Sequence, residues 1–140
     1  MIYEKELQAA IQAVRDAGNL CRMIRRDFHP DNAADKEDKS PVTVADYCAQ
    51  AVISAELFRR FPEDMIVGEE SIEDLTDNAN LLPQIVNYLK SSDGGFTEKQ
   101  FIDSIARCGH TGGGGRFWTV DPIDGTKGFL RNDQYAVALA

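Results

Sequence analysis

The chain has 140 residues, of which 43% are hydrophobic and 27% charged, a composition typical of one domain with a hydrophobic core. Its formal net charge of −8 at pH 7 argues against a nucleic-acid polymer or an anionic membrane as partner, because such binding depends on clustered Lys and Arg. A small phosphate ester remains a possible ligand, since metal ions can neutralise its charge locally.

The sequence indicates neither a membrane segment nor a disulfide framework. No stretch approaches the ~20 apolar residues of a membrane span. The acidic start of the chain, with Glu4 and Glu6, is unlike a signal or transit peptide. Cys21, Cys48 and Cys108 are widely spaced, odd in number and form no Cys-x-x-Cys pair, so we expect reduced thiols in an intracellular compartment, the cytoplasm.

A long amphipathic helix is predicted from residue 4 to about residue 28. Apolar residues recur there at three- and four-residue intervals, so one face should be buried, made of Leu7, Ala10, Ile11, Val14, Ala17, Cys21 and Ile24. We interpret the basic cluster of Arg22, Arg25 and Arg26 as a solvated face rather than a phosphate-binding patch. His29, just before a proline, is expected at the surface.

The polar segment 31–39 predicts a loop, either a lid or a passive linker. Residues 40–46 lead into a second helix reaching about Phe61, with Asp46 as its N-cap. The buried face of this helix should contain Ala49, Val52, Ile53, Leu57 and Phe58.

A turn at 62–64 and a short apolar strand at 65–67 follow, and Gly68-Glu69-Glu70-Ser71 comes directly after the strand. Apolar spacing over 81–89 predicts a helix, and Thr97 with Gln100 has the form of a capping box for another, ending near Arg107 and burying Phe101 and Ile105. The glycine-rich segment 109–115 lacks the Lys-Ser/Thr and helix of a phosphate loop, so it predicts a connection.

Carboxylates crowd at the end of a predicted strand over 116–120, in Asp121-Pro122-Ile123-Asp124-Gly125-Thr126. Pro122 should end the strand and turn the chain, so that Asp121, Asp124 and the Ile123 carbonyl could bind one hard cation. Gly125-Thr126 can begin a short helix whose first N–H groups point at a phosphate. The alternative is a turn in which both aspartates cap local N–H groups. If the 65–67 strand lies beside this one, Glu69 reaches the same edge as Asp121.

The run from Asp121 to Thr126 resembles the signature of the inositol monophosphatase superfamily, which are lithium-sensitive, magnesium-dependent phosphatases. Residues 127–131 and 133–139 resemble the branch that hydrolyses 3'(2'),5'-bisphosphate nucleotides, and residues 39–46 and 68–70 resemble two further motifs of that branch. The resemblance implies a layered α+β fold of the sugar-phosphatase type, with N-terminal helices on a mainly antiparallel sheet. Because residues 135–140 end in an apolar alternation, we expect residues 1–140 to be the incomplete N-terminal part of that domain, truncated in a strand.

The resemblance also implies the roles of individual residues. Two or three magnesium ions would be held by Glu69, Asp121, Asp124 and the Ile123 carbonyl, with Glu70 behind them or in solvent. Asp46 and Thr126 would orient the attacking water, and the amides of Gly125 and Thr126 would hold the phosphate. The implied substrate is 3'-phosphoadenosine 5'-phosphate, giving AMP and phosphate, and Lys127 is a candidate for contact with the second phosphate.

Three alternatives remain open. The first is an inositol phosphate as substrate. The second is a non-catalytic fragment, because family members are longer and carry a C-terminal Trp-Asp motif with another metal-binding aspartate that this sequence lacks. The third is an aspartyl-phosphate phosphotransferase of the haloacid dehalogenase type, in which one residue separates the two aspartates; here Pro122 and Ile123 intervene.

Overall fold

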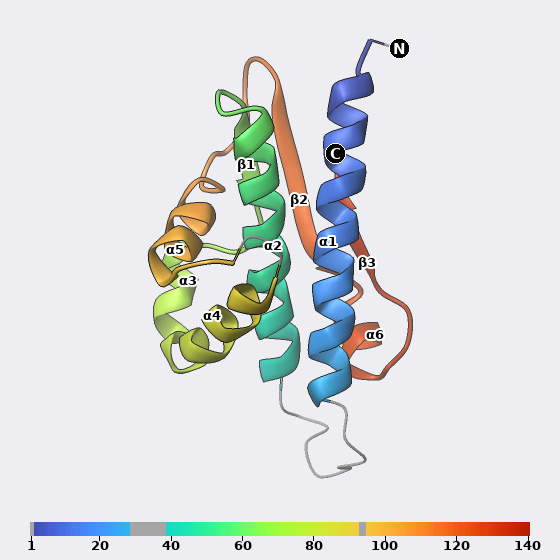
Figure 1. Ribbon diagram of the computed structural model, residues 1–140, viewed down its shortest axis with the longest axis vertical. Helices are drawn as coiled ribbons and strands as arrows, with labels where there is room; N and C mark the ends of the chain where they lie inside the picture. The colour runs from blue at the N-terminus through green and yellow to red at the C-terminus, as the bar shows by residue number, and fades with distance from the viewer. Residues whose placement is uncertain (1, 29–38, 93–94) are drawn as a thin grey trace.

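The computed structural model describes residues 2–28, 39–92 and 95–140. Two long helices come first, α1 (Glu4–Phe28) and α2 (Ser40–Arg60), followed by strand β1 (Met65–Gly68). A helical stretch then contains α3 (Ile72–Asp77), a 3-10 turn (Ala79–Leu81), α4 (Leu82–Ser91) and α5 (Glu98–Ala106). The chain continues with β2 (Phe117–Asp124), α6 (Thr126–Leu130) and β3 (Ala136–Leu139), as Figure 1 shows.

The strands form a sheet in the order β1-β2-β3. β1 runs parallel to β2, with Gly68 opposite Val120, and the helices between the two strands supply the long crossover that parallel pairing needs. β3 runs antiparallel to β2, with Val120 opposite Leu139. The predicted α+β fold, with N-terminal helices packed on a sheet, is confirmed. The expected antiparallel pairing holds for β2 and β3, whereas β1 makes the sheet mixed.

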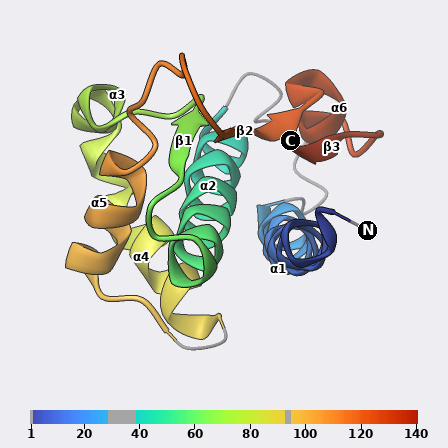
Figure 2. The same ribbon diagram turned by 90° about the horizontal axis from the view of Figure 1, so that it is seen from above.

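Helix α2 lies at the centre of the helical layer. It packs against α1 on one side and against α4 and α5 on the other, and it also contacts β2 (Figure 2). Most of its side chains are buried, including Val44, Cys48, Ala51 and Ile53. A helix that is apolar on nearly all sides must be enclosed by other elements, which explains why α2 rather than α1 occupies this position.

The buried face of α1 differs from the predicted one in its N-terminal half. Leu7 and Ile11 are 46% and 43% exposed, respectively. Ala17, Cys21 and Ile24 are buried as predicted, together with Ala9, Ala13 and Leu20. Ala9, Ala13 and Ala17 recur every four residues along one face of α1, which packs against α2, so small side chains, not the largest apolar ones, determine which face packs. On α2, Phe58 was expected in the core but is 45% exposed, and the guanidinium of Arg107 covers its ring.

The prediction that Asp46 caps the second helix is wrong. Helix α2 begins at Ser40, with Lys39 at the N-cap and Pro41 in the first turn, so Asp46 lies inside the helix. Proline is favoured in a first turn because it needs no amide partner there. This early start leaves the Asp46 carboxylate available for contacts with other elements.

The expectation that Pro122 ends the strand is also wrong. β2 continues to Asp124, and its register with β3 shifts between Asp121 and Asp124, where Pro122 and Ile123 are buried. A proline without an N–H is tolerated in a strand at such an irregularity. The chain therefore turns after Asp124 rather than before it.

Other local predictions have mixed outcomes. The capping box of Thr97 and Gln100 is present at the start of α5. Helix α3, capped by the Ser71 hydroxyl, was not anticipated. His29 and most of the 31–39 loop lie outside the described residues. Cys21, Cys48 and Cys108 are free and buried. Among the helices in the described part of the chain, none has the length and apolar character needed to cross a membrane.

Candidate active site

Parallel pairing of β1 with β2 brings acidic residues to one edge of the sheet. Because Gly68 is opposite Val120, the residues that follow each of them, Glu69 and Asp121, are neighbours. Burial raises the pKa of the Glu69 carboxyl, and so do a hydrogen bond that it donates to Asp121 when protonated and the charges of Asp121 and Asp124. The structure thus makes Glu69 and Asp121 neighbours, with Asp124 near enough for its charge to affect Glu69, whereas binding of a common ion by the three acids stays a prediction.

A buried amide on α2 holds the segment that carries Glu69. Gln50 Nε2 donates to the Glu70 carbonyl at 2.8 Å, and the Glu70 N–H donates to Gln50 Oε1 at 2.8 Å. A Cβ at Gly68 would lie 2.6 Å from Gln50 Nε2, so only glycine fits there. Sequence reasoning missed Gln50, although a glutamine among the apolar positions of a buried helix is a signal that its amide has a fixed partner.

Asp46 and Glu70 complete the acidic cluster. Burial raises the pKa of Asp46 to about 8, with further contributions from the charges of Glu70, Glu69 and Asp121. Burial likewise raises the pKa of Glu70 to about 7, followed by the charges of Glu69, Asp74 and Asp121. The charges of Asp46 and Glu70 therefore interact with those of the sheet-edge carboxylates.

The donor set of this cluster fits a hard cation. Asp121 Oδ1 is buried and has no hydrogen-bond partner, and the surrounding side chains offer carboxylate oxygens, the ligands that magnesium prefers. Their oxygens do not converge on one point: in the described part of the chain, no group of three or more His, Cys, Asp or Glu side chains is placed to hold a metal ion.

The phosphate-binding candidates lie immediately after β2. Gly125 has a left-handed backbone with φ 97°, and it precedes α6, whose first residue is the exposed Thr126. A Cβ at Gly125 would lie 3.3 Å from the Tyr135 Cα, so the loop is tightly closed. Helix α2, which carries Asp46, contacts α6. Within the described residues, no hydrogen bond joins Asp46 to Thr126. Lys127 is exposed.

One arginine of the basic cluster on α1 is not simply solvated. Arg25 Nη1 donates to the Asp133 carbonyl at 2.8 Å, and the guanidinium carbon lies 4.7 Å from the Tyr135 ring centroid. Tyr135 in turn packs edge-on against Phe129 of α6, with centroids 5.1 Å apart. Arg25 therefore ties the segment after Asp124 to α1, a role that the spacing of the arginines did not indicate.

The fold and this acidic site define the class of protein. The chain matches the profile of the Inositol monophosphatase family over residues 3–140, and it belongs to that family. It is 42% identical to 3'(2'),5'-bisphosphate nucleotidase 1 of Arabidopsis thaliana, over 99% of this chain and 43% of the relative. It is 39% identical to 3'(2'),5'-bisphosphate nucleotidase 1 of Candida albicans, over 99% of this chain and 42% of the relative.

A 3'(2'),5'-bisphosphate nucleotidase of Schizosaccharomyces pombe is 37% identical, over 100% of this chain and 44% of the relative. The predicted resemblance to this family and to its bisphosphate nucleotidase branch is confirmed. The chain spans less than half the length of these relatives. The similarity therefore shows the family of this chain and does not show the activity of a whole protein.

Proposed function

We propose that the protein containing this chain is a magnesium-dependent phosphomonoesterase that removes the 3'(2')-phosphate of 3'(2'),5'-bisphosphate nucleotides. For 3'-phosphoadenosine 5'-phosphate the products are AMP and inorganic phosphate. Membership of the inositol monophosphatase family and the names of its nucleotidase relatives support the reaction class. The observation that carries the proposal is the placement of Glu69 beside Asp121 at one sheet edge, with the charges of Asp124 and Asp46 close enough to interact with them.

Glu69, Asp121, Asp124 and the main-chain carbonyl of Ile123 would hold the magnesium ions, two or three of them. The orphaned Asp121 Oδ1 supports this assignment, because a buried carboxylate oxygen without a donor gains most from a cation. The register shift beside Ile123 removes its regular ladder partner on β3. When bound, magnesium supplies charge neutralisation for the transferring phosphoryl group and lowers the pKa of water.

Asp46 and Thr126 would orient the attacking water between them. The position of Asp46 inside α2, where the charges of Glu69 and Asp121 act on it, supports this role. The raised pKa of Asp46 applies to the cluster without a bound cation. Positive charge near Glu69 and Asp121 favours the carboxylate form of Asp46, which is the form that accepts a proton.

The amides of Gly125 and Thr126 would hold the substrate phosphate. The first N–H groups of a helix have no intrahelical acceptor, and the left-handed turn at Gly125 directs the chain into α6. Lys127 on the exposed side of α6 would meet the second phosphate of the nucleotide. An intracellular, cytoplasmic location fits a small phosphorylated nucleotide as substrate and the three free, buried thiols.

The test uses the full-length protein that carries this chain. Replacing Asp121 with Asn (D121N) should abolish magnesium-dependent phosphate release from 3'-phosphoadenosine 5'-phosphate, because the ligand charge is lost while the shape is kept. The matched control is Asp133→Asn, since the Asp133 side chain is exposed and its hydrogen bonds, to Arg25 and Gly128, are made by main-chain atoms. Turnover of D121N near that of the control would contradict the proposal.

The same assay separates the remaining alternatives. Phosphate release should be measured from inositol 1-phosphate and from the nucleotide in parallel. The first substrate is implied by the name of the family and the second by the names of the relatives. A full-length protein that releases phosphate from neither compound would favour a non-catalytic role. A phospho-aspartate trapped during turnover would favour the phosphotransferase mechanism.

A further inference from the structure

A cavity of about 700 Å³ lies between α1, α2 and α5, away from the acidic cluster. On α2 it is lined by Val52, Ala55 and Glu56, whereas Asp46 and Gln50 project from another side of the helix, as expected for 3.6 residues per turn. The volume falls within the ~300–1,000 Å³ of typical small-molecule sites. The cavity is therefore large enough for a ligand and separate from the proposed active site.

Among the described residues, Arg107 in the wall of this cavity has no hydrogen-bond or ion-pair partner for its side chain. Its Nη1 is buried and makes no hydrogen bond, while its guanidinium carbon lies 4.0 Å from the Phe58 ring centroid. A ring face attracts the cation but does not satisfy a guanidinium donor in the way an oxygen does. The Arg107 guanidinium therefore has donor capacity that no acceptor in the described part of the chain uses.

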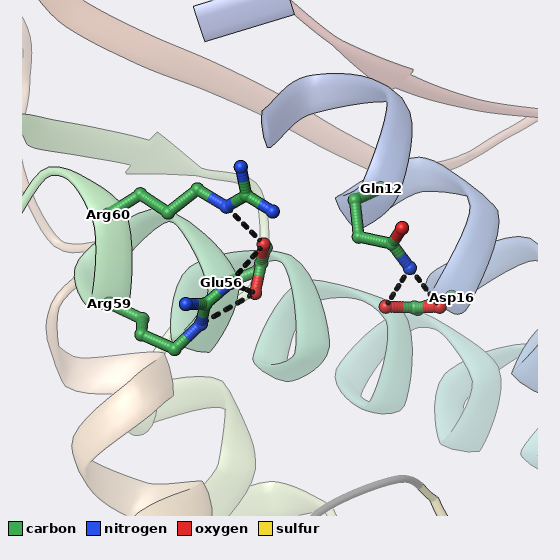
Figure 3. Close-up of polar contacts among 5 residues, drawn as sticks. All are labelled: Gln12, Asp16, Glu56, Arg59 and Arg60. Carbon is green, nitrogen blue, oxygen red and sulfur yellow. Dashed lines mark hydrogen bonds and ion pairs between the residues drawn. The ribbon is translucent and has the colours of Figure 1, made fainter. Parts of the chain in front are cut away.

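The carboxylates that line the cavity already have partners. Glu56 accepts from Arg59 Nη2 at 2.9 Å and from Arg60 Nε at 2.6 Å, and Asp16 accepts from Gln12 Nε2 at 2.9 and 3.0 Å (Figure 3). Neither acid bonds to Arg107. Among the described residues that line the cavity, Arg107 is thus the charged group without an ion-pair or hydrogen-bond partner for its side chain.

The rest of the lining includes an apolar surface. Leu20 and Met23 of α1, Val52 and Ala55 of α2, and Phe96 before α5 contribute to it. Such a wall gains free energy by covering apolar atoms of a ligand. The cavity therefore combines one unpaired cation with a hydrophobic wall, a combination that suits an amphipathic anion.

We propose that this cavity binds a small organic oxyanion, with a carboxylate or phosphate group on Arg107 and a flat apolar body against Leu20, Met23 and Phe96. The planar guanidinium matches either group through paired N–H donors. The proposal does not depend on the phosphatase activity, because the acidic cluster would repel an anion in the absence of magnesium.

The experiment titrates the protein with 2-naphthoate, 1-naphthyl phosphate and uncharged 2-naphthalenemethanol, by calorimetry and by NMR of the backbone amides. A chelator removes divalent metal, so that the phosphate ester is not drawn to the carboxylates. At least one oxyanion should bind with a Kd below about 1 mM and about tenfold more tightly than the alcohol. Amide shifts should centre on Met23, Val52 and Phe96, and the tighter of the two anions identifies the group that the site prefers.

Variants decide whether Arg107 and the cavity are responsible. Arg107→Gln should weaken the oxyanions about tenfold or more and leave the alcohol unchanged. Ala55→Phe should fill the cavity and weaken all three probes, with the fold checked by circular dichroism. The control is Arg26→Gln, an exposed arginine of α1, which should bind like the wild type. Absence of binding by both anions, unchanged affinity in Arg107→Gln, or shifts confined to Glu69 and Asp121 would overturn the proposal.

Discussion

Two groups of acidic side chains on or around α2 lie in opposite electrostatic surroundings. Burial raises the pKa of Glu56, but hydrogen bonds and the charges of Arg59 and Arg60 bring it below its ordinary value. Burial also raises the pKa of Asp46, and there the neighbouring charges of Glu70, Glu69 and Asp121 raise it further, to about 8. The same helix thus carries one acid whose charge is neutralised locally and another whose charge is opposed by its neighbours.

This difference between Glu56 and Asp46 shows which carboxylates have a counter-charge on their own helix and which do not. Arg59 and Arg60 need only helical spacing from Glu56 to pair with it, so the sequence of α2 supplies its own counter-charge. No such spacing relates Asp46 to Glu69 and Asp121, which come from other elements. The repulsion among them is therefore not neutralised within the helix, as expected at a functional site.

The largest effect is expected where backbone packing holds the acidic cluster together. In Gly68→Ala the new Cβ would lie 2.6 Å from Gln50 Nε2 and 2.7 Å from the Cys108 Cβ, so we expect the free energy of unfolding to fall by about 2–3 kcal/mol. Gly114→Ala is the control, because nothing lies within 4 Å of a Cβ there. Urea denaturation measures both. Equal midpoints would mean that Gln50 does not clamp this segment.

Neutralising one acid from each group should change stability in opposite directions. In metal-free protein at pH 8, Asp46→Asn should raise the free energy of unfolding by about 1–2 kcal/mol, because it removes a buried, repelled charge. Glu56→Gln should lower it by about 0.5–1 kcal/mol, a modest effect because its partner Arg59 is 64% exposed. Denaturant titration in the presence of a chelator measures the free energy of unfolding of both variants and of the wild type. A lower value for Asp46→Asn than for the wild type would contradict the inferred repulsion of Asp46 by its neighbours.

The pH dependence of the metal-free protein should report the same cluster. Asp46 and Glu70 have raised pKa values of about 8 and about 7, so the folded state holds their protons more tightly than the unfolded chain. Their contribution to stability is full below about pH 4 and is lost as the pH rises to about 8. We expect Tm to fall by about 3–6 °C between pH 5 and pH 8.

Magnesium at pH 8 should reverse part of this decrease in Tm. In Asp46→Asn, Tm should decrease less between pH 5 and pH 8 than in the wild type. Thermal scans monitored by circular dichroism measure Tm at each pH. A Tm that rises steadily from pH 5 to pH 8 in the wild type would show that the carboxylates are not mutually repelled.

The smallest effect concerns the link between α1 and the segment after Asp124. Arg25→Ala removes a hydrogen bond to the Asp133 carbonyl and the contact with the Tyr135 ring, and should lower the free energy of unfolding by about 1 kcal/mol. Hydrogen exchange of residues 125–135 should accelerate in this variant. Arg26→Ala, at an exposed neighbouring position, should leave both unchanged, and equal exchange in the two variants would rule out a clamp.

Local sequence patterns predicted much of the fold. Helical periodicity located α1, α4 and α5, and the capping box at Thr97 marked the start of α5, because such signals depend on residues within one or two turns. The motif around Asp121 identified the family and most of the candidate site. The Asp46 cap and the strand end at Pro122 were wrong, since a proline in a first turn and a bulge in a sheet each allow more than one local outcome.

The sequence by itself determined which oxygen ligands this protein offers and that they follow short strands, because residue type and spacing are properties of the chain. Only the tertiary structure decided that β1 pairs in parallel with β2, which makes Glu69 and Asp121 neighbours, that Gln50 binds the main chain of Glu70, and that Arg25 binds the carbonyl of Asp133. Contacts between residues far apart in the chain depend on how whole elements pack, and no local pattern specifies that packing.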